Sequence, residues 1–487
     1  MLTLPDLILV TGATGYVGSC LIPHLLEKGY RVRVLARDPQ RLQGHIWLSR
    51  VEVAGGDLSN ASLLKAAFVD VTAAIYLVHN MSSGRHYESR ELESAFNFLA
   101  AAEASGIQHI IYLGGLANPE ENIGSHLRSR LRTGDTLRSG RIPVTEFRAS
   151  LVIGSGSISF EMIRYLTEQL PVIVGSPNLK RLTQPIAIQN VLEYLLAALE
   201  TPACRGSVYE IGGGDVLSYA ETMQTYARLR GLTRRVLLLP WVPDALMAFI
   251  TGALTPVPTR IARPLIGGMR GDSIVRAGSA LETFPQIRPL DYRDSLLQAL
   301  ANLSPSRLDP VWRNGASLCR MKREGFFIEN RQVRIRVQPE VVYQVVSGMG
   351  GKYGWIYLNG LWKLRGSIDR LIGGPGLRGR SSKQNPSVGD VLDFYRVEAV
   401  KPGSLLRLKA ELKAPGLGWM EWRTSAEVDG DGTLLSQTVF FAPAGVWGFI
   451  YWYFLWPVHS LVFAGLIRAI ARCAIKFVVP REDDHEH

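Results

Sequence analysis

The sequence has few cysteines and no leader-like start. Its four cysteines among 487 residues, Cys20, Cys204, Cys319 and Cys473, include no pair close enough for a CxxC metal site or redox pair. This spacing excludes a disulfide-rich secreted scaffold and favours a reducing compartment. The first six residues lack the basic region of a signal peptide, so we expect a cytoplasmic protein.

The chain also lacks a strong excess of one charge. Lysine and arginine number 54 and aspartate and glutamate 43, which gives a formal charge of +11. With 47% hydrophobic and 20% charged residues, the composition excludes a mainly disordered chain and a polytopic membrane protein. The charge suits anionic small molecules or a membrane surface. No basic stretch interleaved with aromatic residues points to nucleic acid.

In the first half of the chain, short β-branched runs alternate with helical stretches. The pattern predicts strands at 7–11, 31–36, 74–78, 109–113 and 143–147, with helices at 16–28 and 88–104. Such alternation is typical of an α/β fold with a doubly wound parallel sheet. Residues 150–300 keep a mixed character, with an irregular stretch at 240–264. We expect them to form a substrate-side lobe of one domain spanning 1–301.

A polar stretch interrupted by proline and glycine at 302–325 predicts a linker. After it, the sequence pattern changes from alternating strands and helices to successive strands. A second domain is expected at 326–479, followed by a tail at 480–487. Its candidate strands, separated by Pro-Gly or Asp-Gly turns, are 332–337, 392–400, 405–412, 421–428 and 434–441. With a helix at 339–346 and a helical end, the pattern predicts an antiparallel sheet closed by a long C-terminal helix.

A glycine-rich turn, Thr11-Gly12-Ala13-Thr14-Gly15-Tyr16-Val17-Gly18, follows the first strand and opens the first helix. Gly12 permits the tight turn, Gly15 lets the backbone approach a pyrophosphate, and Gly18 allows close packing of helix on strand. The free N–H groups and the positive end of the helix dipole then face the diphosphate. The predicted binding residues of the turn are Gly12, Thr14, Gly15, Tyr16, Val17 and Gly18.

The end of the second strand bears on which dinucleotide is bound. An acidic residue there often holds the ribose hydroxyls of NAD. Here Arg37 takes that place, and its guanidinium can pair with the 2′-phosphate of NADP. The alternatives are a solvated arginine and an NAD site served by Asp38. We expect NADP.

Three further stretches accompany the glycine turn: Gly56-Asp57-Leu58, Tyr76-Leu77-Val78-His79 and Tyr112-Leu113-Gly114-Gly115-Leu116. Together they resemble the atypical and extended short-chain dehydrogenase/reductases, most closely the NmrA-like branch, over roughly residues 5–300. The resemblance implies a Rossmann sheet with NAD(P) bound across it. It further implies that Asp57, Leu58, Leu77 and Val78 line the path of the adenine and the nicotinamide ribose, and that Gly114 lies beside the cofactor.

The catalytic residues usual in that family are missing. His126 stands at the position of the family's tyrosine, Arg130 at that of its lysine, and Gly114 and Gly115 in the region of its serine. An imidazole with a reference pKa of about 6.5 can donate the proton that accompanies hydride transfer. Arg130 can bind cofactor hydroxyls or a substrate anion. Glu161 faces either the active-site cleft or solvent.

Two kinds of function remain open at this position. The first is a reductase that passes hydride from NADPH to a hydrophobic carbonyl or enone, with His126 as proton donor. The second is a dinucleotide-binding sensor without turnover, in which His126 is an ordinary helix residue. A lipid-handling module near a membrane is a further alternative.

The second domain combines these strands and the helical end with four notable stretches: Gly350-Gly-Lys-Tyr-Gly-Trp355, Leu361-Trp362-Lys-Leu-Arg365-Gly366, Asp369-Arg-Leu-Ile-Gly373-Gly374 and Gly389-Asp390-Val-Leu-Asp393-Phe394. With them it resembles the helix-grip fold of START and polyketide-cyclase-like proteins and, more specifically, an uncharacterised domain found behind such Rossmann domains. The resemblance implies an apolar cavity for a hydrophobic ligand. Trp355, Trp362, Trp419 and Trp422 are candidates to line it, with core packing as the alternative. Because Trp419 and Trp422 are three apart, they should face opposite sides of one strand.

The segment 444–467 carries no charged residue over 24 positions. An uncharged apolar segment of this length is long enough to span a bilayer. Mid-segment tryptophans and Pro457 argue against a span. Beyond it, Arg468, Arg472 and Lys476 recur every four residues and form one cationic face. We expect a helix packed in the fold, with peripheral membrane contact through 444–476 or a true span as alternatives.

Overall fold

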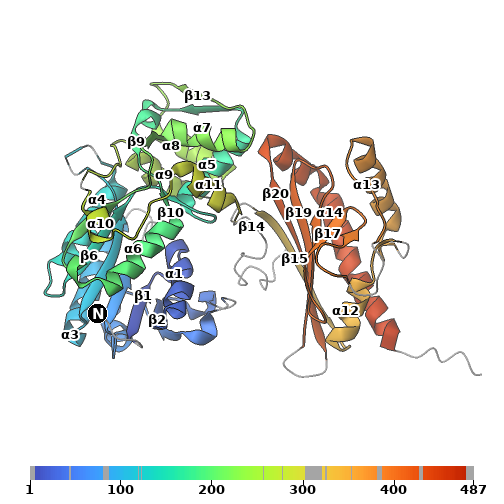
Figure 1. The fold of residues 1–487 in the computed structure, drawn as a ribbon, viewed down its shortest axis with the longest axis horizontal. Helices are drawn as coiled ribbons and strands as arrows, with labels where there is room; N and C mark the ends of the chain where they lie inside the picture. The colour runs from blue at the N-terminus through green and yellow to red at the C-terminus, as the bar shows by residue number, and fades with distance from the viewer. Residues whose placement is uncertain are drawn as a thin grey trace, which may run out of the picture. The chain divides into compact units, whose positions relative to one another are not determined.

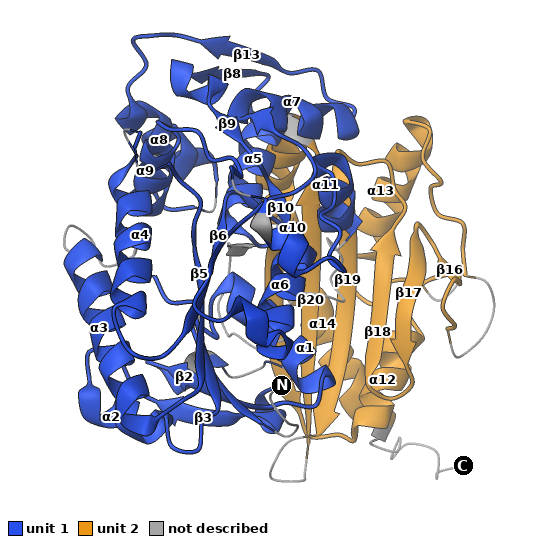
Figure 2. Ribbon diagram, turned by 60° about the vertical axis from the view of Figure 1, so that its left-hand side comes forward, with its two compact units in different colours: residues 1–311 blue, residues 312–487 orange. Residues whose placement is uncertain are grey.

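The computed structural model divides into two compact units, Met1–Val311 and Trp312–His487, coloured blue and orange in Figure 2. The residues it describes are 6–42, 45, 47–79, 87–118, 120–121, 123–255, 257–276, 278–301, 321–323, 326–351, 354–380, 386–426 and 432–478. The division between the units falls inside the stretch expected as a linker. Of that stretch only 321–323 belongs to the described residues.

A seven-stranded parallel sheet forms the centre of unit 1, with helices on both of its faces (Figure 1). Its strand order is β3-β2-β1-β4-β5-β6-β11, and every neighbouring pair is parallel. The strands are β1 Leu7–Thr11, β2 Arg31–Ala36, β3 Glu52–Gly55, β4 Ala73–Tyr76, β5 His109–Gly115, β6 Val144–Ala149 and β11 Val208–Ile211. The predicted doubly wound parallel sheet is therefore confirmed.

Alternate residues of the strands supply two hydrophobic cores, one on each face of the sheet. Ile8 and Val10 of β1 pack with α1 and α6, whereas Leu7 and Leu9 pack with α2, α3 and α4. These helices are α1 Tyr16–Glu27, α2 Ala61–Ala67, α3 Tyr87–Ser105, α4 Ser125–Arg138 and α6 Ile188–Glu200. Because both faces are covered, β1 is apolar throughout and not alternating.

The rest of unit 1 forms a lobe around a third core. It contains three two-stranded sheets, pairing β7 with β10, β8 with β13, and β9 with β12. Its strands are β7 Val152–Ile153, β8 Val172–Gly175, β9 Leu182–Thr183, β10 Ile186–Ala187, β12 Leu217–Ser218 and β13 Arg235–Leu238. Its helices are α5 Ile158–Gln169, α7 Tyr219–Leu229, α8 Asp244–Leu254, α9 Thr259–Gly268, α10 Ser279–Thr283 and α11 Tyr292–Ala301.

A separate seven-stranded antiparallel sheet forms the centre of unit 2, in the order β14-β15-β20-β19-β18-β17-β16. The strands are β14 Met321–Arg323, β15 Phe326–Ile335, β16 Val391–Leu392, β17 Tyr395–Lys401, β18 Leu405–Ala410, β19 Gly416–Ala426 and β20 Thr433–Pro443. The helices are α12 Pro339–Ser347, α13 Asn359–Leu371 and α14 Gly445–Val478. The predicted antiparallel sheet with a long C-terminal helix is confirmed.

The long helix α14 packs on one face of this sheet. Trp422 Nε1 donates to the Gln437 side chain at 2.9 Å, and Gln437 Nε2 donates to the Phe463 carbonyl of α14 at 2.9 Å. The Trp452 ring of α14 stacks on Phe327 and Phe441 of the sheet. Trp422 therefore faces α14.

The opposite face of the sheet carries charged side chains. Trp419 Nε1 donates to Glu398 at 3.0 Å, and Glu421 pairs with Arg407 on the neighbouring strand. Trp419 thus lies on the other side of β19 from Trp422, as the strand period predicted.

Several element boundaries differ from the sequence-based expectations. The stretch 240–264 is irregular in part, as expected, but it also contains α8 and the first part of α9, which begin directly after Pro243 and Pro258. Proline at a helix start keeps an extended, fixed backbone and removes no helical hydrogen bond, so it starts these helices without breaking them. Strand β15 begins at Phe326, earlier than expected, and α13 was not predicted as a helix.

Candidate functional site

The carboxyl ends of β1, β4 and β5 meet where the strand order of unit 1 reverses. The chain moves outward from β1 to β2 and β3, and then returns to β4 on the other side of β1. In open α/β sheets this crevice beyond the strand ends is the usual ligand site. Gly12 follows β1, Leu77 and Val78 follow β4, and Gly114 lies at the end of β5. The fold therefore brings these sequence-predicted residues to one edge of the sheet.

The glycine turn has the tight geometry that its sequence suggested. Gly12 has a φ of +76°, and a Cβ there would lie 3.0 Å from the Leu77 carbonyl atoms. The Gly15 N–H donates to the Gly12 carbonyl at 2.8 Å. A Cβ on Gly18 would collide with the Gly12 carbonyl oxygen, so helix α1 and the turn fit only because glycine stands at 18.

Helix α1 begins at an open end. Its N-cap is Gly15, which has no side chain that could accept a hydrogen bond from the first turn. The first N–H groups of a helix have no acceptor within the helix, and the dipole makes this end positive. Thr14 and Gly15 are exposed, while Tyr16 and Val17 are half-buried. This end of α1 can thus cradle a diphosphate with backbone N–H groups.

Arg37 and Asp57 lie together beyond the ends of β2 and β3. Arg37 follows β2, Asp57 follows β3, and their side chains approach to 3.8 Å while both remain exposed. The Asp57 carboxylate also accepts from the Ser59 N–H at 2.9 Å. The guanidinium is thus held loosely at the surface, where an anionic group can reach it.

Leu58, Leu77 and Thr11 have structural contacts of their own. The Leu58 side chain belongs to the core beneath α2 and α3, and its carbonyl accepts from Asn97 Nδ2 at 3.0 Å. The Thr11 hydroxyl accepts from the Leu77 N–H at 3.2 Å and donates to the Ile75 carbonyl. The side chain of Leu58 is thus used for packing, and the buried Thr11 ties β1 to β4 beside the glycine turn.

Helix α4 carries His126 and Arg130, and the two have different surroundings. Arg130 is 8% exposed; its guanidinium donates to the Leu113 carbonyl of β5 and lies 5.3 Å from the centre of the Tyr112 ring. Its Nη1 lies 4.0 Å from Glu91 of α3. The Tyr112 hydroxyl donates back to the Arg130 carbonyl at 2.9 Å. Arg130 is therefore fixed between α3, α4 and β5.

His126 lies one turn before Arg130 with a half-buried ring, and its Nδ1 is buried without a hydrogen-bond partner. Desolvation, the positive charge of Arg130 and the nearby His79 lower the pKa of His126 to about 3. The imidazole is therefore neutral at pH 7. This value lies well below the reference pKa of about 6.5 that the sequence analysis used for this imidazole.

The sequence-based choice of site residues missed His79. It is the last residue of the quoted stretch Tyr76-Leu77-Val78-His79 but was not chosen as a site residue, and the fold brings it close enough to His126 for a charge on one to affect the other. Desolvation and the charge of Arg130 lower its pKa as well, although the side chain keeps exposed surface. The signal that could have found it is a histidine placed directly after a strand that ends in the crevice.

The two glycines at the end of β5 make room for α4 and leave none for a serine. A Cβ on Gly115 would lie 2.9 Å from Leu127 of α4, and one on Gly114 would lie 3.2 Å from the buried Glu146. Glu146 pairs with Arg138 and with Arg148, the latter at 2.7 Å. A side chain at 114 would thus have to displace the Glu146 carboxylate, and one at 115 the end of the Leu127 side chain.

Glu161 takes neither of its two predicted places. It is 3% exposed, pairs with Arg164 at 3.4 Å and accepts from the Gly156 N–H at 3.1 Å. Desolvation raises its pKa. Because both carboxylate oxygens are engaged in the core of the lobe, Glu161 lies neither in an open cleft nor in solvent.

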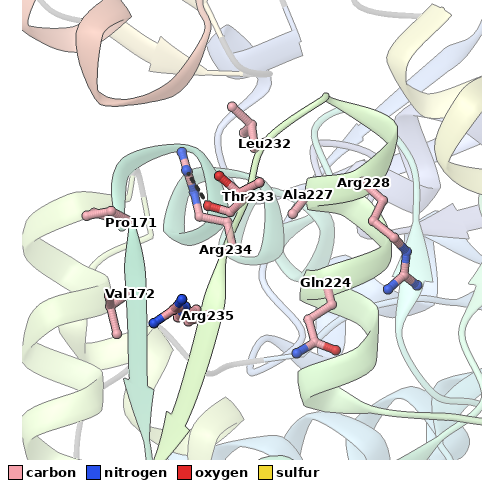
Figure 3. Close-up of a pocket in the computed structure, with 9 residues that line it drawn as sticks. All are labelled: Pro171, Val172, Gln224, Ala227, Arg228, Leu232, Thr233, Arg234 and Arg235. Carbon is pink, nitrogen blue, oxygen red and sulfur yellow. Dashed lines mark hydrogen bonds between the residues drawn. The ribbon is translucent and has the colours of Figure 1, made fainter.

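A groove of about 680 Å³ opens on the lobe, away from the strand ends. Figure 3 shows β8 and β13 on one side and α7, with Gln224 and Arg228, on the other. Arg234 does not reach freely into it, because its guanidinium donates to the Thr167 and Glu168 carbonyls at the end of α5. The residues that line the groove include no histidine, carboxylate, tyrosine or cysteine that could transfer a proton.

In unit 2 the four candidate tryptophans are all engaged in packing. Trp355 and Trp362 stack with ring centres 4.2 Å apart, and Trp355 Nε1 donates to Asp393 at 2.9 Å. Trp419 and Trp422 lie on opposite faces of β19, as described above. These contacts favour the core-packing alternative for this set.

Comparison with known proteins finds one family model that matches residues of each unit. Residues 5–234 match the NmrA-like family, and residues 324–466 match a family described as a protein of unknown function, DUF2867. A (4-alkanoyl-5-oxo-2,5-dihydrofuran-3-yl)methyl phosphate reductase of Streptomyces griseus is 26% identical over 265 residues, which cover 51% of this chain and 86% of the relative.

Two further comparisons also cover the N-terminal part. A photosystem II assembly factor of Trieres chinensis is 25% identical over 239 residues, covering 48% of this chain and 72% of the relative. The solved structure of Citrobacter sp. triphenylmethane reductase complexed with NADP(H) has 23% identity and a TM-score of 0.49, covering 60% of this chain and 99% of that one.

Proposed function

We propose that unit 1, whose residues 5–234 match the NmrA-like family, is an NADPH-binding reductase of hydrophobic carbonyl or enone substrates. The observation that carries the proposal is the open N-terminus of α1 beside the Gly12 turn, at the point where the strand order reverses. The Streptomyces relative is named as a reductase, which supports the same reaction type.

The residues present fit a dinucleotide. The glycine turn has no side chain where a diphosphate would approach, and the uncapped N–H groups of α1 would hold its oxygens. Arg37, exposed at the end of β2, would meet the 2′-phosphate. Bound NADPH would supply the hydride.

The side chains around His126 suit the remaining half of such a reaction. When hydride adds to a carbonyl carbon, negative charge develops on the oxygen, which must be stabilised and must then take a proton, here from solvent water. A neutral His126 offers a ring N–H as a hydrogen-bond donor to that oxygen. Arg130, fixed by Leu113 and Glu91, adds positive charge nearby without leaving its place. His126 would be the catalytic residue and Arg130 a positioning residue.

The first experiment is a calorimetric titration of the full-length protein with NADPH, beside a Gly15→Asp variant. Gly15 has an ordinary extended backbone, but a Cβ there would lie 3.1 Å from the Gly12 carbonyl oxygen, so thermal unfolding of the variant is measured beside its binding. The aspartate places a carboxylate against the diphosphate. We expect binding by the wild type and a loss of about tenfold or more in the variant from like-charge repulsion. Absence of binding by the folded wild type would overturn the proposal.

The second experiment measures NADPH oxidation with a panel of carbonyls and enones. We expect His126→Ala to lower kcat about 100-fold and to leave the Kd for NADPH unchanged, whereas the exposed His24→Ala has no effect. Because His126 is neutral above about pH 4, kcat should stay flat from about pH 6 to about pH 8. A decline as pH rises through about 6.5 would identify an imidazolium donor instead. Tight binding without turnover would favour the dinucleotide sensor.

For unit 2 we propose a helix-grip domain that holds a hydrophobic small molecule. The antiparallel sheet with α14 against one face supports the helix-grip assignment. The proposed organisation of the chain is a reductase domain at 1–301, a linker at 302–325 and a helix-grip domain at 326–479. Identification of apolar compounds that co-purify with the full-length protein tests the ligand. A cytoplasmic location, with contact to a membrane through residues 444–476, completes the proposal.

A further inference from the structure

Large apolar side chains of α13 and of the first half of α14 are exposed. Trp447 and Phe454 of α14 are 74% and 79% exposed, and Leu371 of α13 is 86% exposed. Soluble proteins seldom leave side chains of this size exposed together. We call this set the apolar face; its members are Trp447, Ile450, Phe454, Val458 and Leu461 of α14, and Leu361, Leu364, Ile368 and Leu371 of α13.

The members of the apolar face form one stripe on each helix, because they are spaced three or four residues apart. The opposite side of α14 is already occupied: Phe449, Trp452, Phe463 and Leu466 are buried within the unit. The exposed stripe is therefore a second apolar side of a helix whose first side already serves the core.

The two stripes lie near one another. Tyr357, just before α13, lies against Gly465 of α14. Desolvation, together with the nearby charge of Arg365 in α13, lowers the pKa of His459 in α14 to about 4. Helix α13 therefore runs back along the first half of α14, and Figure 1 shows both at the same end of this unit. Apolar residues from two helices thus gather on one part of the surface.

The exposed side of α14 changes from apolar to basic along its length. Beyond Leu461 the same side continues with Arg468, Arg472 and Lys476, all exposed. Among the described residues no carboxylate lies within ion-pair distance of these three side chains. An apolar stretch followed by unpaired cations matches a bilayer surface, where acyl chains lie beneath anionic headgroups.

We propose that the apolar face inserts shallowly into the surface of an anionic phospholipid bilayer, with Arg468, Arg472 and Lys476 against the headgroups. The helix Trp447–Phe477 is long and apolar enough to cross a membrane, and an 18-residue window in it has a mean hydropathy of 1.6, but half of that window is buried in the protein. A helix that contributes one side to a protein core cannot expose all sides to lipid, so it lies on the membrane and does not span it.

The experiment is flotation of the full-length protein with vesicles of phosphatidylcholine alone or mixed with phosphatidylglycerol. We expect flotation with the anionic vesicles that high salt reverses. Phe454→Ser should reduce partitioning about tenfold or more, and Arg468→Glu with Arg472→Glu should reduce it about fivefold or more for each charge. Phe96→Ser, at a phenylalanine of α3 that is 64% exposed, is the matched apolar control and should float like the wild type.

Leu371→Ser tests the contribution of α13 and should also weaken flotation. Unchanged thermal unfolding and NADPH binding of each variant keep the result separate from folding and from the proposed reductase. The proposal is overturned if the wild type does not float, if Phe454→Ser floats equally well, or if only detergent extracts the protein from the vesicles, which indicates a span. A dimer in solution that Phe454→Ser dissociates would overturn it too, because a second copy would then cover the face.

Discussion

At the scale of single residues, burial decides what an arginine can do. Arg37 and Arg130 were both predicted to act on the cofactor or substrate. Arg37 is 60% exposed with one carboxylate at 3.8 Å, so its guanidinium can accept a new anionic partner. Arg130 donates to the Leu113 carbonyl and lies against Tyr112, and pulling it out would leave those groups unsatisfied. Of these two arginines, only Arg37 can bind a ligand anion without losing contacts in the protein core.

Arg37→Ala should therefore change dinucleotide preference. We expect the affinity for NADPH to fall about tenfold, because a charge-assisted hydrogen bond to the 2′-phosphate is lost, and the affinity for NADH to stay the same. Arg31→Ala removes an arginine from the opposite end of β2, where it pairs with Glu52, and is the control. Titration of each variant with both nucleotides measures the effect. An equal fall for NADH would show that Arg37 does not read the phosphate.

At the scale of elements, the position of α4 depends on small residues and one buried carboxylate. Gly134 of α4 stands over Glu146 of β6, whose Cδ lies 2.7 Å from where a Cβ on that glycine would be. Glu146 is fully buried and pairs with Arg138 and Arg148. Since His126 and Arg130 are on α4, the fit between this helix and the sheet sets the geometry of the site.

Gly134→Ala should destabilise unit 1 although alanine is the better helix former. The added methyl must displace Glu146 from its two arginines, and we expect a loss of about 1–3 kcal/mol in the free energy of unfolding. Gly267→Ala in α9, where a Cβ meets nothing within 4 Å, is the matched control and should be neutral or stabilising by up to about 1 kcal/mol. Denaturant unfolding distinguishes the two; equal stability would show that Glu146 has room to move.

At the scale of the whole molecule, several histidines of the folded protein are hard to protonate. His109 of β5 is fully buried; its Nε2 donates to the Thr145 hydroxyl, which itself donates to the Cys204 carbonyl. A proton on Nδ1 would be buried without an acceptor. Desolvation lowers the pKa of His109 to about 4, and that of His126 to about 3.

Acid should therefore unfold the protein through these groups. Between about pH 6.5 and about pH 4 the unfolded chain binds a proton at His109 that the native state does not, so stability is full above that window and falls as pH falls. For His109 alone the loss is about 2 kcal/mol at about pH 5. Buried carboxyl groups such as Glu161, whose pKa is raised, act in the opposite sense.

The measurement is thus the difference between the wild type and His109→Gln, which keeps a donor to Thr145 without titrating. Thermal unfolding from about pH 8 to about pH 5 should show a shallower fall for the variant, by about the contribution of one histidine. Parallel curves would mean that His109 is protonated in the native state.

The sequence by itself determined the architecture of both units and the glycine turn. Hydrophobic period and turn residues are local properties of the chain, so alternating runs specified the parallel sheet, and Gly12, Gly15 and Gly18 specified the tight start of α1. Tertiary structure decided which side chains are buried and which meet. Tertiary contacts fix the Arg130 guanidinium, place His79 near His126 and bury Glu161 in the core of the lobe. The sequence could not show this, because desolvation and charge depend on neighbours distant in sequence. Likewise, the uncharged run in α14 does not predict which side of the helix packs against the sheet. In the structure the sheet covers one side of α14 and leaves the other side exposed.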